Sequence, residues 1–423
     1  MLTVHEALIA LLVEVRPFAV ETHPLAETHG LALAKDIVSN TDSPPFDKAL
    51  MDGYAVRAAD IMNGRATLTV IEEVTAGHVP QKPVGPGETT QIMTGAVIPD
   101  GADAVTPIED SELEDGSAWS KTVKIATRQI ESGTNIIHRG TSMKRGEQVL
   151  PAGRLLRPQE LGTLAEMGQH MIAVRRQPRI GVLATGDELV PIFETPGPGQ
   201  IRNSNETMLV AQIRRSGGEP VPLGIAHDER NHLRERILAG LECDVLLLCG
   251  GVSAGKLDLV PSELEAVGVR QVFHKVQVKP GKPIWFGVFE PSDTESAADF
   301  DRRCYVFGLP GNPVSSMVCF ELFVRTAIRQ LMGIEPSQPA PVRARLTKDH
   351  VARGNRPTYY PAYLDWNESG PVVTPVKWHG SSDLRATVEA NAMVLFQAGD
   401  QIHQAGEIIE VFRWEVDTAT YTN

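Results

Sequence analysis

Between residues 179 and 332 the chain alternates short, almost wholly apolar runs with longer amphipathic ones. Apolar strands separated by amphipathic helices indicate a parallel sheet with helices on both faces and right-handed crossovers. The predicted strands cover residues 179–184, 221–226, 244–249 and 305–307, and the predicted helices cover residues 205–216, 229–239 and 313–332. The last helix has clear ends, with Asn312 as N-cap, Pro313 in the first turn and Gly333 after the last turn.

Two other regions lack this alternation. Residues 42–153 are rich in Gly, Pro and short β-type runs, which indicates a separate β-rich module. After a Pro-rich linker at 335–341, about 80 residues remain, enough for a small β-barrel or sandwich. Helices are predicted over 2–15 and 158–167. At 423 residues, the chain is long enough for about three domains.

Charge and apolar patterning exclude several classes of partner. With 40 Lys and Arg against 53 Asp and Glu, the net charge is -13, so we expect no general attraction to nucleic acid or to an anionic membrane. The apolar runs are far shorter than the roughly 18 residues of a membrane-spanning helix. The N-terminus has no secretory pattern, and the four cysteines form no CxxC pair, so we expect reduced, buried thiols in a cytoplasmic protein.

The residues that follow the predicted strands are the first candidates for a binding site, because ligands bind beyond the carboxyl ends of strands in such sheets. They are residues 185–188, 227–229, 250–258 and 308–313. Their glycines and the helix starts behind them favour a phosphate. Glu188, Asp228 and Asp258 would repel it unless Mg²⁺ takes carboxylate and phosphate oxygens together. The alternative is that these acids are helix caps or solvated loop residues.

Residues 250–256 also match the pattern G-x-x-x-x-G-K directly after an apolar strand, which is the context of a phosphate-binding P-loop. The next residue, however, is Leu257 instead of the Ser or Thr that holds Mg²⁺. Asp258 and Pro261 then interrupt the helix that should begin there. The sequence therefore disfavours a P-loop nucleotidase.

A local cluster of lysines lies between residues 273 and 283. If this stretch is a strand, Lys275, Gln277 and Lys279 share one face, because side chains alternate along a strand. Lys282 follows after a Pro-Gly turn. In an acidic protein this cluster is the expected site for an anion, although a solvated face of an edge strand is the alternative.

Several segments, taken in order, closely resemble the molybdopterin molybdenumtransferase family, which includes MoeA and the gephyrin E domain. The family signature PPFDNSAMDGYA appears at residues 44–55, with Lys48, Ala49 and Leu50 in place of Asn-Ser-Ala. The other matching segments are TGA at 94–96, TGDEL at 185–189, GGVSAG at 250–255, KPGKP at 279–283 and GLPGNPVS at 308–315. The order of so many segments makes the resemblance specific.

The resemblance implies a multidomain fold of α/β plus β type. A three-layer α/β/α molybdopterin-binding domain would span 175–333, and a C-terminal β-barrel would span 334–423. An inserted β-rich domain would span 44–146. An elongated connecting domain would be formed by 1–43 and 147–174.

The implied activity is insertion of molybdate into adenylylated molybdopterin with Mg²⁺-dependent release of AMP, at a cleft between the two subunits of a homodimer. A molybdopterin adenylyltransferase would supply the substrate, and molybdoenzymes would accept the product. Tungstate, a similar tetrahedral oxyanion, remains an alternative to molybdate. A non-catalytic molybdopterin-binding or scaffold protein of the same fold is the other function considered, but the retained like-charged clusters favour the enzyme.

The resemblance also assigns roles to individual residues. Catalytic roles fall on Glu188, Asp228 and Asp258, which would also bind the metal, and on Lys275, Lys279, Asp52 and Thr94. Substrate-binding roles fall on Asp187, Gly250, Gly251, Val252, Ser253, Pro280, Lys282, Pro283, Pro310, Asn312, Arg356, Ser381 and Ser382. Asp52 and Thr94 would reach the partner subunit's cleft, and Lys282, Arg356, Ser381 and Ser382 would form the molybdate pocket. One departure is Ser142, where the family commonly has Asp.

Overall fold

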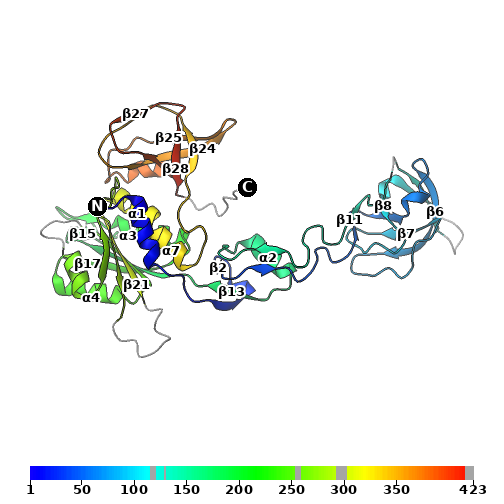
Figure 1. Cartoon of the computed structure of the whole chain (residues 1–423), viewed down its shortest axis with the longest axis horizontal. Helices are drawn as coiled ribbons and strands as arrows, with labels where there is room; N and C mark the ends of the chain where they lie inside the picture. Colours follow the sequence, from blue (N-terminus) through cyan, green and yellow to red (C-terminus); the bar gives the residue numbers. More distant parts are fainter. Residues whose placement is uncertain (115–120, 128–129, 253–258, 292–302, 415–423) are drawn as a thin grey trace. The chain divides into compact units, whose positions relative to one another are not determined.

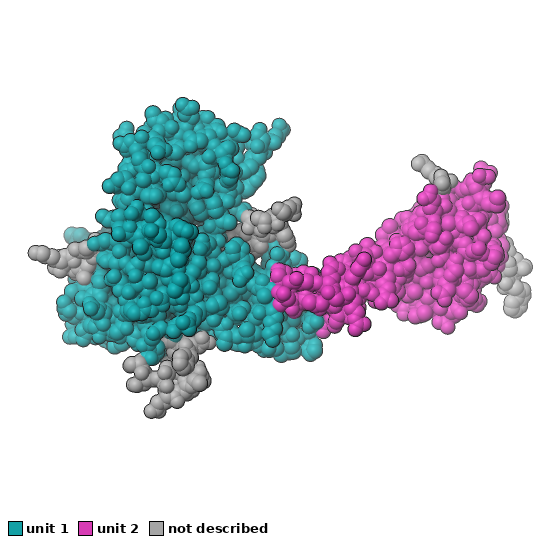
Figure 2. All heavy atoms as spheres, viewed as in Figure 1, with its two compact units in different colours: residues 1–35, 152–165, 169–423 teal, residues 36–151, 166–168 magenta. Residues whose placement is uncertain are grey.

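The computed structural model describes residues 1–114, 121–127, 130–252, 259–291 and 303–414 (Figure 1). The chain divides into two compact units, coloured separately in Figure 2. Unit 1 comprises residues 1–35, 152–165 and 169–423, and unit 2 comprises residues 36–151 and 166–168.

Unit 1 contains a six-stranded sheet in the order β17-β14-β18-β21-β20-β19. Its parallel strands are β14 (Arg179–Thr185), β17 (Glu219–Ala226), β18 (Val245–Cys249) and β21 (Cys304–Leu309). These four strands are parallel, as predicted, but the sheet also has two strands that the sequence analysis did not include in it, β19 (Arg270–His274) and β20 (Trp285–Phe289), and both are antiparallel to their neighbours. A short connection joins these two strands, and parallel pairing would need a crossover of a dozen or more residues.

Helices cover both faces of the sheet, which gives three layers (Figure 1). On one face the core includes residues of α1 (Val4–Glu14), α3 (Ser204–Arg215), α6 (Pro313–Cys319) and α7 (Arg325–Leu331). A π-helical turn, Phe320–Val324, joins α6 to α7. On the other face lie α4 (Arg230–Gly240) and α5 (Val260–Ala266). Among the helices that the structure describes, none combines the length and apolar character needed to cross a membrane.

The ends of these helices follow their sequence signals. Thr3 and Glu6 form a capping box at the start of α1, in which the Thr3 hydroxyl accepts from the backbone N–H of Glu6 at 3.2 Å. Asn312 is the N-cap residue of α6, as predicted, and Pro313 stands in its first turn. Gly333, with φ of +66°, lies directly after the last helical turn.

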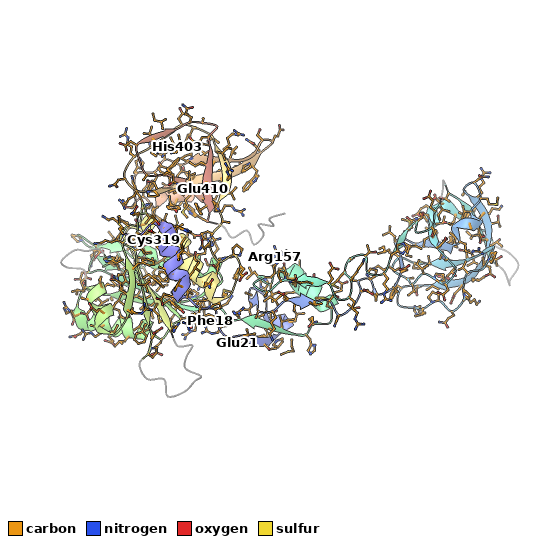
Figure 3. All side chains as sticks on the ribbon, viewed as in Figure 1. Phe18, Glu21, Arg157, Cys319, His403 and Glu410 are labelled. Carbon is orange, nitrogen blue, oxygen red and sulfur yellow. The ribbon has the colours of Figure 1, made fainter. Side chains whose placement is uncertain are left out.

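A small three-stranded sheet and a helix make up the rest of the N-terminal part of unit 1. The strands, in spatial order, are β1 (Glu21–Pro24), β13 (Met171–Arg175) and β2 (Ala32–Leu33). Next to them lies α2 (Pro158–Glu166), where the buried carboxylate of Glu160 accepts hydrogen bonds from Arg154 and from Arg157, which is labelled in Figure 3.

The C-terminal part of unit 1 is a closed five-stranded barrel, which decides between the predicted barrel and sandwich. Its strands are β22 (Val342–Leu346), β25 (Gly370–Pro375), β24 (Thr358–Asn367), β26 (Ala392–Phe396) and β28 (Ile408–Arg413). Residues such as Leu364, Val394 and Phe396 fill its interior. A separate pair is formed by β23 (His350–Ala352) and β27 (Gln401–His403).

Unit 2 is β-rich, as the Gly- and Pro-rich composition predicts. Its main sheet has the order β8-β5-β7-β6-β10-β9. The strands are β5 (Gly53–Val56), β6 (Arg65–Val74), β7 (Glu88–Ile92), β8 (Ala104–Pro107), β9 (Ser111–Glu114) and β10 (Lys121–Ala126). Two short pairs complete it, β4 (Lys48–Ala49) with β11 (Ile136–Ile137) and β3 (Ile37–Val38) with β12 (Gln148–Leu150). Single 3₁₀ turns occur in the two units at Leu25–Glu27, Ala58–Asp60, Ile108–Asp110 and Arg385–Glu389.

Candidate functional site

A cavity of about 570 Å³ lies at the carboxyl ends of β14, β18 and β21. It is where a ligand is expected in a sheet of this kind. Among the residues predicted from the sequence, Glu188, Asp228, Gly250, Gly251, Val252, Pro283, Pro310 and Asn312 line it. We call it the strand-end cavity. Two other predicted residues, Ser253 and Asp258, lie outside the described residues.

The glycines after β18 are required by the backbone. Gly250 has φ of +107°, and a Cβ atom there would lie 2.5 Å from the carbonyl oxygen of Thr185. At Gly251, with φ of +61°, a Cβ atom would lie 2.8 Å from a methyl group of Val260. The backbone N–H of Gly250 donates to the carbonyl of Leu309 at 3.1 Å. These glycines therefore let β18 turn sharply beside neighbouring strands, and the N–H of Gly250 is already used within the protein.

Two carboxylates enter the cavity from different strands. Glu188 follows β14 and Asp228 follows β17. Gly186, two residues before Glu188, has φ of +143°, a backbone conformation that residues with a Cβ atom rarely adopt. The backbone N–H of Asp228 donates to Oδ1 of Asp187 at 3.1 Å, which ties the two loops together. Asp187 itself does not line this cavity and faces a second one.

The start of α3 forms another wall, which the sequence analysis did not predict. Asn203 is the N-cap, and its side chain accepts from the backbone N–H of Glu206 at 3.3 Å. Asn205 donates through Nδ2 to the carbonyl of Gly311 at 2.7 Å and to Sγ of Cys249 at 3.0 Å. Its Oδ1 is buried without a partner in the described part of the chain. The signal was the Asn-Ser-Asn run at the helix start, which offers backbone N–H groups and polar side chains to a ligand.

The barrel reaches the wall of the cavity through Ser381. Asn312 donates through Nδ2 to Oγ of Ser381 at 2.9 Å, and the backbone N–H of Val314 donates to the carbonyl of Ser381 at 3.0 Å. Ser382 follows in the same turn. The structure thus brings two residues predicted for different parts of the site, Asn312 and Ser381, into direct contact.

The prediction that the lysine cluster lies on one strand is wrong. The strand β19 ends at His274, Lys275 has φ of +68°, and β20 begins only at Trp285. Two prolines in the segment Lys-Pro-Gly-Lys-Pro lack the backbone N–H that a ladder needs, and its glycine favours a turn. Lys275, Gln277 and Lys279 therefore do not form one strand face. Lys282 is exposed in the turn, and Lys275 is half-buried.

Lys279 and Arg356 meet where the loop after β19 contacts the barrel. The backbone N–H of Lys279 donates to the carbonyl of Pro357 at 2.9 Å, and its Nζ donates to the carbonyl of Arg353 at 3.2 Å. The guanidinium of Arg356 donates to the carbonyl of Val278 at 2.8 Å. Pro280 directly follows Lys279, and Pro283 lines the strand-end cavity, so this loop connects the basic residues to the cavity wall.

In unit 2, Asp52 and Thr94 bind each other. The Thr94 hydroxyl and backbone N–H both donate to Oδ1 of Asp52 at 2.6 Å, and these two bonds lower the pKa of Asp52. Ser142, which replaces the usual Asp, donates its backbone N–H to the carbonyl of Ser43 at 2.9 Å. The fold of unit 2 thus pairs the two predicted residues that it carries.

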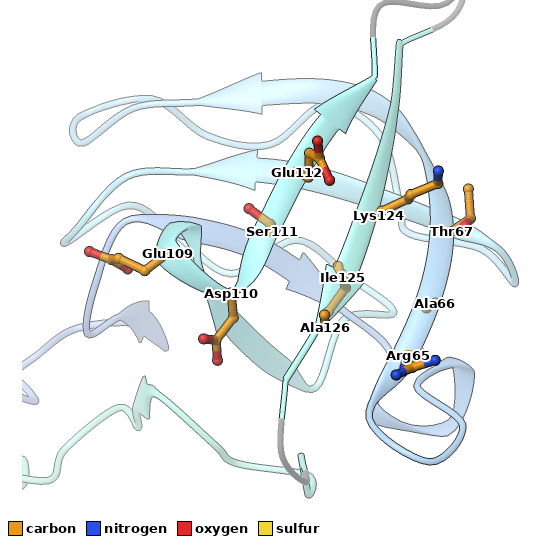
Figure 4. Close-up of a pocket in the computed structure, with 10 residues that line it drawn as sticks. All are labelled: Arg65, Ala66, Thr67, Glu109, Asp110, Ser111, Glu112, Lys124, Ile125 and Ala126. Carbon is orange, nitrogen blue, oxygen red and sulfur yellow. The ribbon is translucent and has the colours of Figure 1, made fainter.

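Unit 2 also has a cavity of about 490 Å³ over β6, β9 and β10 (Figure 4). Its polar lining mixes Arg65 and Lys124 with Glu109, Asp110 and Glu112. None of the residues predicted for the site lines it. The strand-end cavity, which eight of the predicted residues line, is therefore the better candidate site.

The strand-end cavity has two carboxylates among its lining residues, which are side chains of a type that can hold a divalent cation. In the described ranges, no group of three or more His, Cys, Asp or Glu side chains gathers as a metal site. Glu188 and Asp228, however, line one cavity. Mg²⁺ is commonly held by one or two carboxylates together with substrate phosphates. The donor set is therefore of the type that Mg²⁺ uses with a phosphorylated substrate.

The chain thus has a three-layer α/β domain, with a cavity at the strand ends beside a glycine turn, and a β-barrel joined to it. This arrangement is typical of an α/β protein that binds an anionic ligand. Three family models match the chain in order: the MoeA N-terminal region (domain I and II) at residues 2–168, a probable molybdopterin binding domain at 181–330 and the MoeA C-terminal region (domain IV) at 343–414. The chain belongs to the MoeA family, as its sequence motifs predict.

Individual relatives agree with this membership. A molybdopterin molybdenumtransferase of Staphylococcus aureus is 33% identical over 92% of this chain and 89% of its own length. The protein of that name from Bacillus subtilis is 33% identical over 90% of this chain and 86% of its own. Among solved structures, a molybdopterin biosynthesis moeA protein from Pyrococcus horikoshii matches with a TM-score of 0.78 and 30% identity, covering 98% of this chain and 100% of that one.

Proposed function

We propose that this chain is a molybdopterin molybdenumtransferase that inserts molybdate into adenylylated molybdopterin and releases AMP. The observation that carries the proposal is that Glu188, Asp228 and the glycine turn at 250–251 line one cavity with the start of α3. This combination suits a substrate with adjacent phosphates, because helix N-termini attract anions and carboxylates recruit a metal ion. The names of the relatives support the same activity.

Within this proposal the walls of the cavity have separate tasks. The N-terminus of α3 and the backbone N–H groups of Gly311 and Asn312 bind phosphate oxygens, helped by the positive end of the helix. The buried Oδ1 of Asn205 accepts a hydrogen bond from the substrate. Lys279 and Arg356 hold the incoming oxyanion, together with Lys282, Ser381 and Ser382. Lys275 contributes positive charge nearby.

Magnesium is proposed as the resident cation. Glu188 and Asp228 would hold it, with Asp258 as a third ligand. When bound, it would neutralise phosphate charge and act as a Lewis acid. The remaining contribution of the protein is to hold the dithiolene and the oxyanion in a reactive arrangement, and no covalent nucleophile of the protein is required.

The proposal includes a homodimer in which Asp52 and Thr94 of one subunit serve the cleft of the other. A molybdopterin adenylyltransferase would act before this protein, and molybdoenzymes would accept its product. The solution mass tests the dimer directly.

The activity is tested by incubating the purified chain with adenylylated molybdopterin, Mg²⁺ and molybdate, and by measuring AMP. We expect molybdate-dependent release that falls about 100-fold or more in Asp228→Asn and in Glu188→Gln, because each removes a charge that acts on the reacting phosphates. The matched control is Glu368→Gln, an exposed acid in the turn between β24 and β25, which should retain the wild-type rate.

Two outcomes would contradict the proposal. If the wild-type chain binds the substrate but releases no AMP, the scaffold alternative is favoured. If Asp228→Asn and Glu188→Gln both release AMP at the wild-type rate, the strand-end cavity is not the site.

A further inference from the structure

The two lysines assigned to the oxyanion lie on a short segment, residues 275–279, which we call the lysine loop. It lies between the end of β19 at His274 and the start of β20 at Trp285. Lys275 has φ of +68°, a left-handed conformation that is unfavourable for a residue with a Cβ atom. Contacts with other parts of the chain are therefore needed to fix where the side chains of Lys275 and Lys279 begin.

The apolar side of the lysine loop is anchored in the main core of unit 1. Val276 and Val278 are both 0% exposed and belong to the same apolar cluster as residues of α1. The backbone N–H of Lys275 donates to the carbonyl of Ile284 at 2.9 Å. These contacts fix the start of the loop, and its other polar groups are held from two further directions.

The barrel holds the far end of the lysine loop. The backbone N–H of Lys279 donates to the carbonyl of Pro357 at 2.9 Å, and the backbone N–H of Tyr359 donates to the carbonyl of Lys279 at 2.8 Å. Lys279 and Thr358 thereby form a parallel bridge. The end of the loop is thus paired with the start of β24.

The N-terminal segment, Met1–Thr3, holds the middle of the lysine loop. The backbone N–H of Gln277 donates to the carbonyl of Leu2 at 2.8 Å, and Nε2 of the same residue donates to the carbonyl of Met1 at 3.0 Å. Leu2 and Val276 form a second parallel bridge. Gln277 therefore binds the N-terminal segment through both its backbone and its side-chain amide.

The N-terminal segment is itself fixed by the capping box of α1. The backbone N–H of Thr3 donates to Oε2 of Glu6 at 2.8 Å, and the Thr3 hydroxyl donates to the same oxygen at 3.0 Å. Helix α1 is in turn anchored in the core through Ala7 and Leu11, which are both 0% exposed. Hydrogen bonds therefore connect the start of α1, the lysine loop and β24 in succession.

We propose that Gln277 is a positioning residue, which holds the lysine loop against the N-terminal segment so that Lys275 and Lys279 are in place for the incoming oxyanion. This inference rests on the proposed function, in which the two lysines act on that anion. A loop that is ordered before the anion arrives removes an ordering cost from binding. Gln277 should therefore act on the affinity for molybdate more than on the rate of the bound complex.

The test is steady-state AMP release by the full chain at varied molybdate. Gln277→Met keeps the length of the side chain but removes the donor to Met1. We expect the KM for molybdate to rise about fivefold with kcat unchanged, which corresponds to roughly 1 kcal/mol. The matched control is Gln81→Met in unit 2, which removes a side-chain amide bond to the carbonyl of Val79, also at 3.0 Å, and should change neither constant.

Two further measurements separate positioning from a general loss of stability. Thr3→Ala breaks the capping box at the other end of the same connection, so its effect on the KM should be smaller in the Gln277→Met background than in wild type. Hydrogen exchange of the backbone amides in the lysine loop should become faster in Gln277→Met, while the midpoint of urea denaturation changes little.

Three results would overturn the positioning role: an unchanged KM in Gln277→Met, an equal rise in Gln81→Met, or fully additive effects of Gln277→Met and Thr3→Ala. The proposed function fails separately, if the wild-type chain releases no AMP. The role of Gln277 is then decided by the Kd for molybdate from isothermal titration, which should still rise about fivefold in Gln277→Met.

Discussion

Asn312 is the N-cap residue of α6, yet its side chain donates to Ser381 of the barrel at 2.9 Å instead of capping its own helix. An N-cap hydrogen bond typically contributes about 1 kcal/mol to stability, so the helix forgoes that contribution. In return the wall of the strand-end cavity is connected to the turn that carries Ser381 and Ser382. The barrel is thereby held against the cavity by a residue of the cavity itself.

Replacing Ser381 by Ala should therefore affect catalysis more than stability. Because the Asn312 side chain is exposed and Ser381 is only half-buried, we expect the free energy of unfolding to change by less than about 1 kcal/mol. The KM for molybdate should rise several-fold, since the turn loses its position relative to the cavity. Steady-state AMP release at varied molybdate measures this. Ser369→Ala, at an exposed barrel turn, is the control, and an equal effect there would contradict the proposed role.

Substitutions of Gly250 and Gly370 by Ala give a second test, because their losses of stability separate the effect of steric overlap from that of backbone strain. Gly250→Ala places a Cβ atom 2.5 Å from the carbonyl oxygen of Thr185, at φ of +107°. Gly370 has a similar φ of +102°, but no atom lies within 4 Å of a Cβ placed there. Gly370→Ala should therefore cost about 1 kcal/mol, and Gly250→Ala more, with loss of AMP release. Urea denaturation compares them, and equal losses of stability would show that the overlap relaxes.

The fold was largely predictable because its signals are local. The apolar run of β18 and the N-cap position of Asn312 each determine an element without reference to the rest of the chain. The antiparallel strands β19 and β20 were harder, because strand direction depends on the length of the connection between them. The lysine segment was misassigned because alternation was weighed above its two prolines.

The site was less predictable for a related reason. Residues that follow strands can be listed from the sequence, and two residues listed in this way, Glu188 and Asp228, line the strand-end cavity. Side-chain direction cannot be read from such a list, so Asp187 was grouped with Glu188 although the two line different cavities. Asn205 was missed because its importance comes from Gly311 and Cys249, which are distant in the sequence.

The carboxylate of Glu160 predicts how stability depends on pH. Burial alone would raise the pKa of this group, but hydrogen bonds from Arg157 and Arg154 outweigh it and lower the pKa to about 2. Because the folded pKa lies below the unfolded value of 4.5, the stabilisation is fully present above pH 4.5 and is lost as pH falls towards 2. It amounts to at most about 3 kcal/mol.

Glu160→Gln should therefore destabilise the chain at neutral pH, and its difference from wild type should shrink as pH falls through this window. Urea denaturation at several pH values measures the difference. The control is Glu389→Gln, which removes an exposed ion pair with Arg385 and should cost less than about 1 kcal/mol at every pH. A difference that stays constant with pH would rule out the buried carboxylate as its source.

The four cysteines are all free and buried, and burial raises the pKa of each thiol. A thiol that is both inaccessible and protonated reacts slowly, so native protein should not react with Ellman's reagent at about pH 8, whereas denatured protein should yield four thiols per chain. Cys249 is the thiol closest to reactivity, because it lines the strand-end cavity beside the amide of Asn205. Asn205→Ala should expose it and make one thiol reactive, and the double variant with Cys249→Ser should return to none. Reaction of Asn205→Ala that persists in the double variant would show that another cysteine had opened.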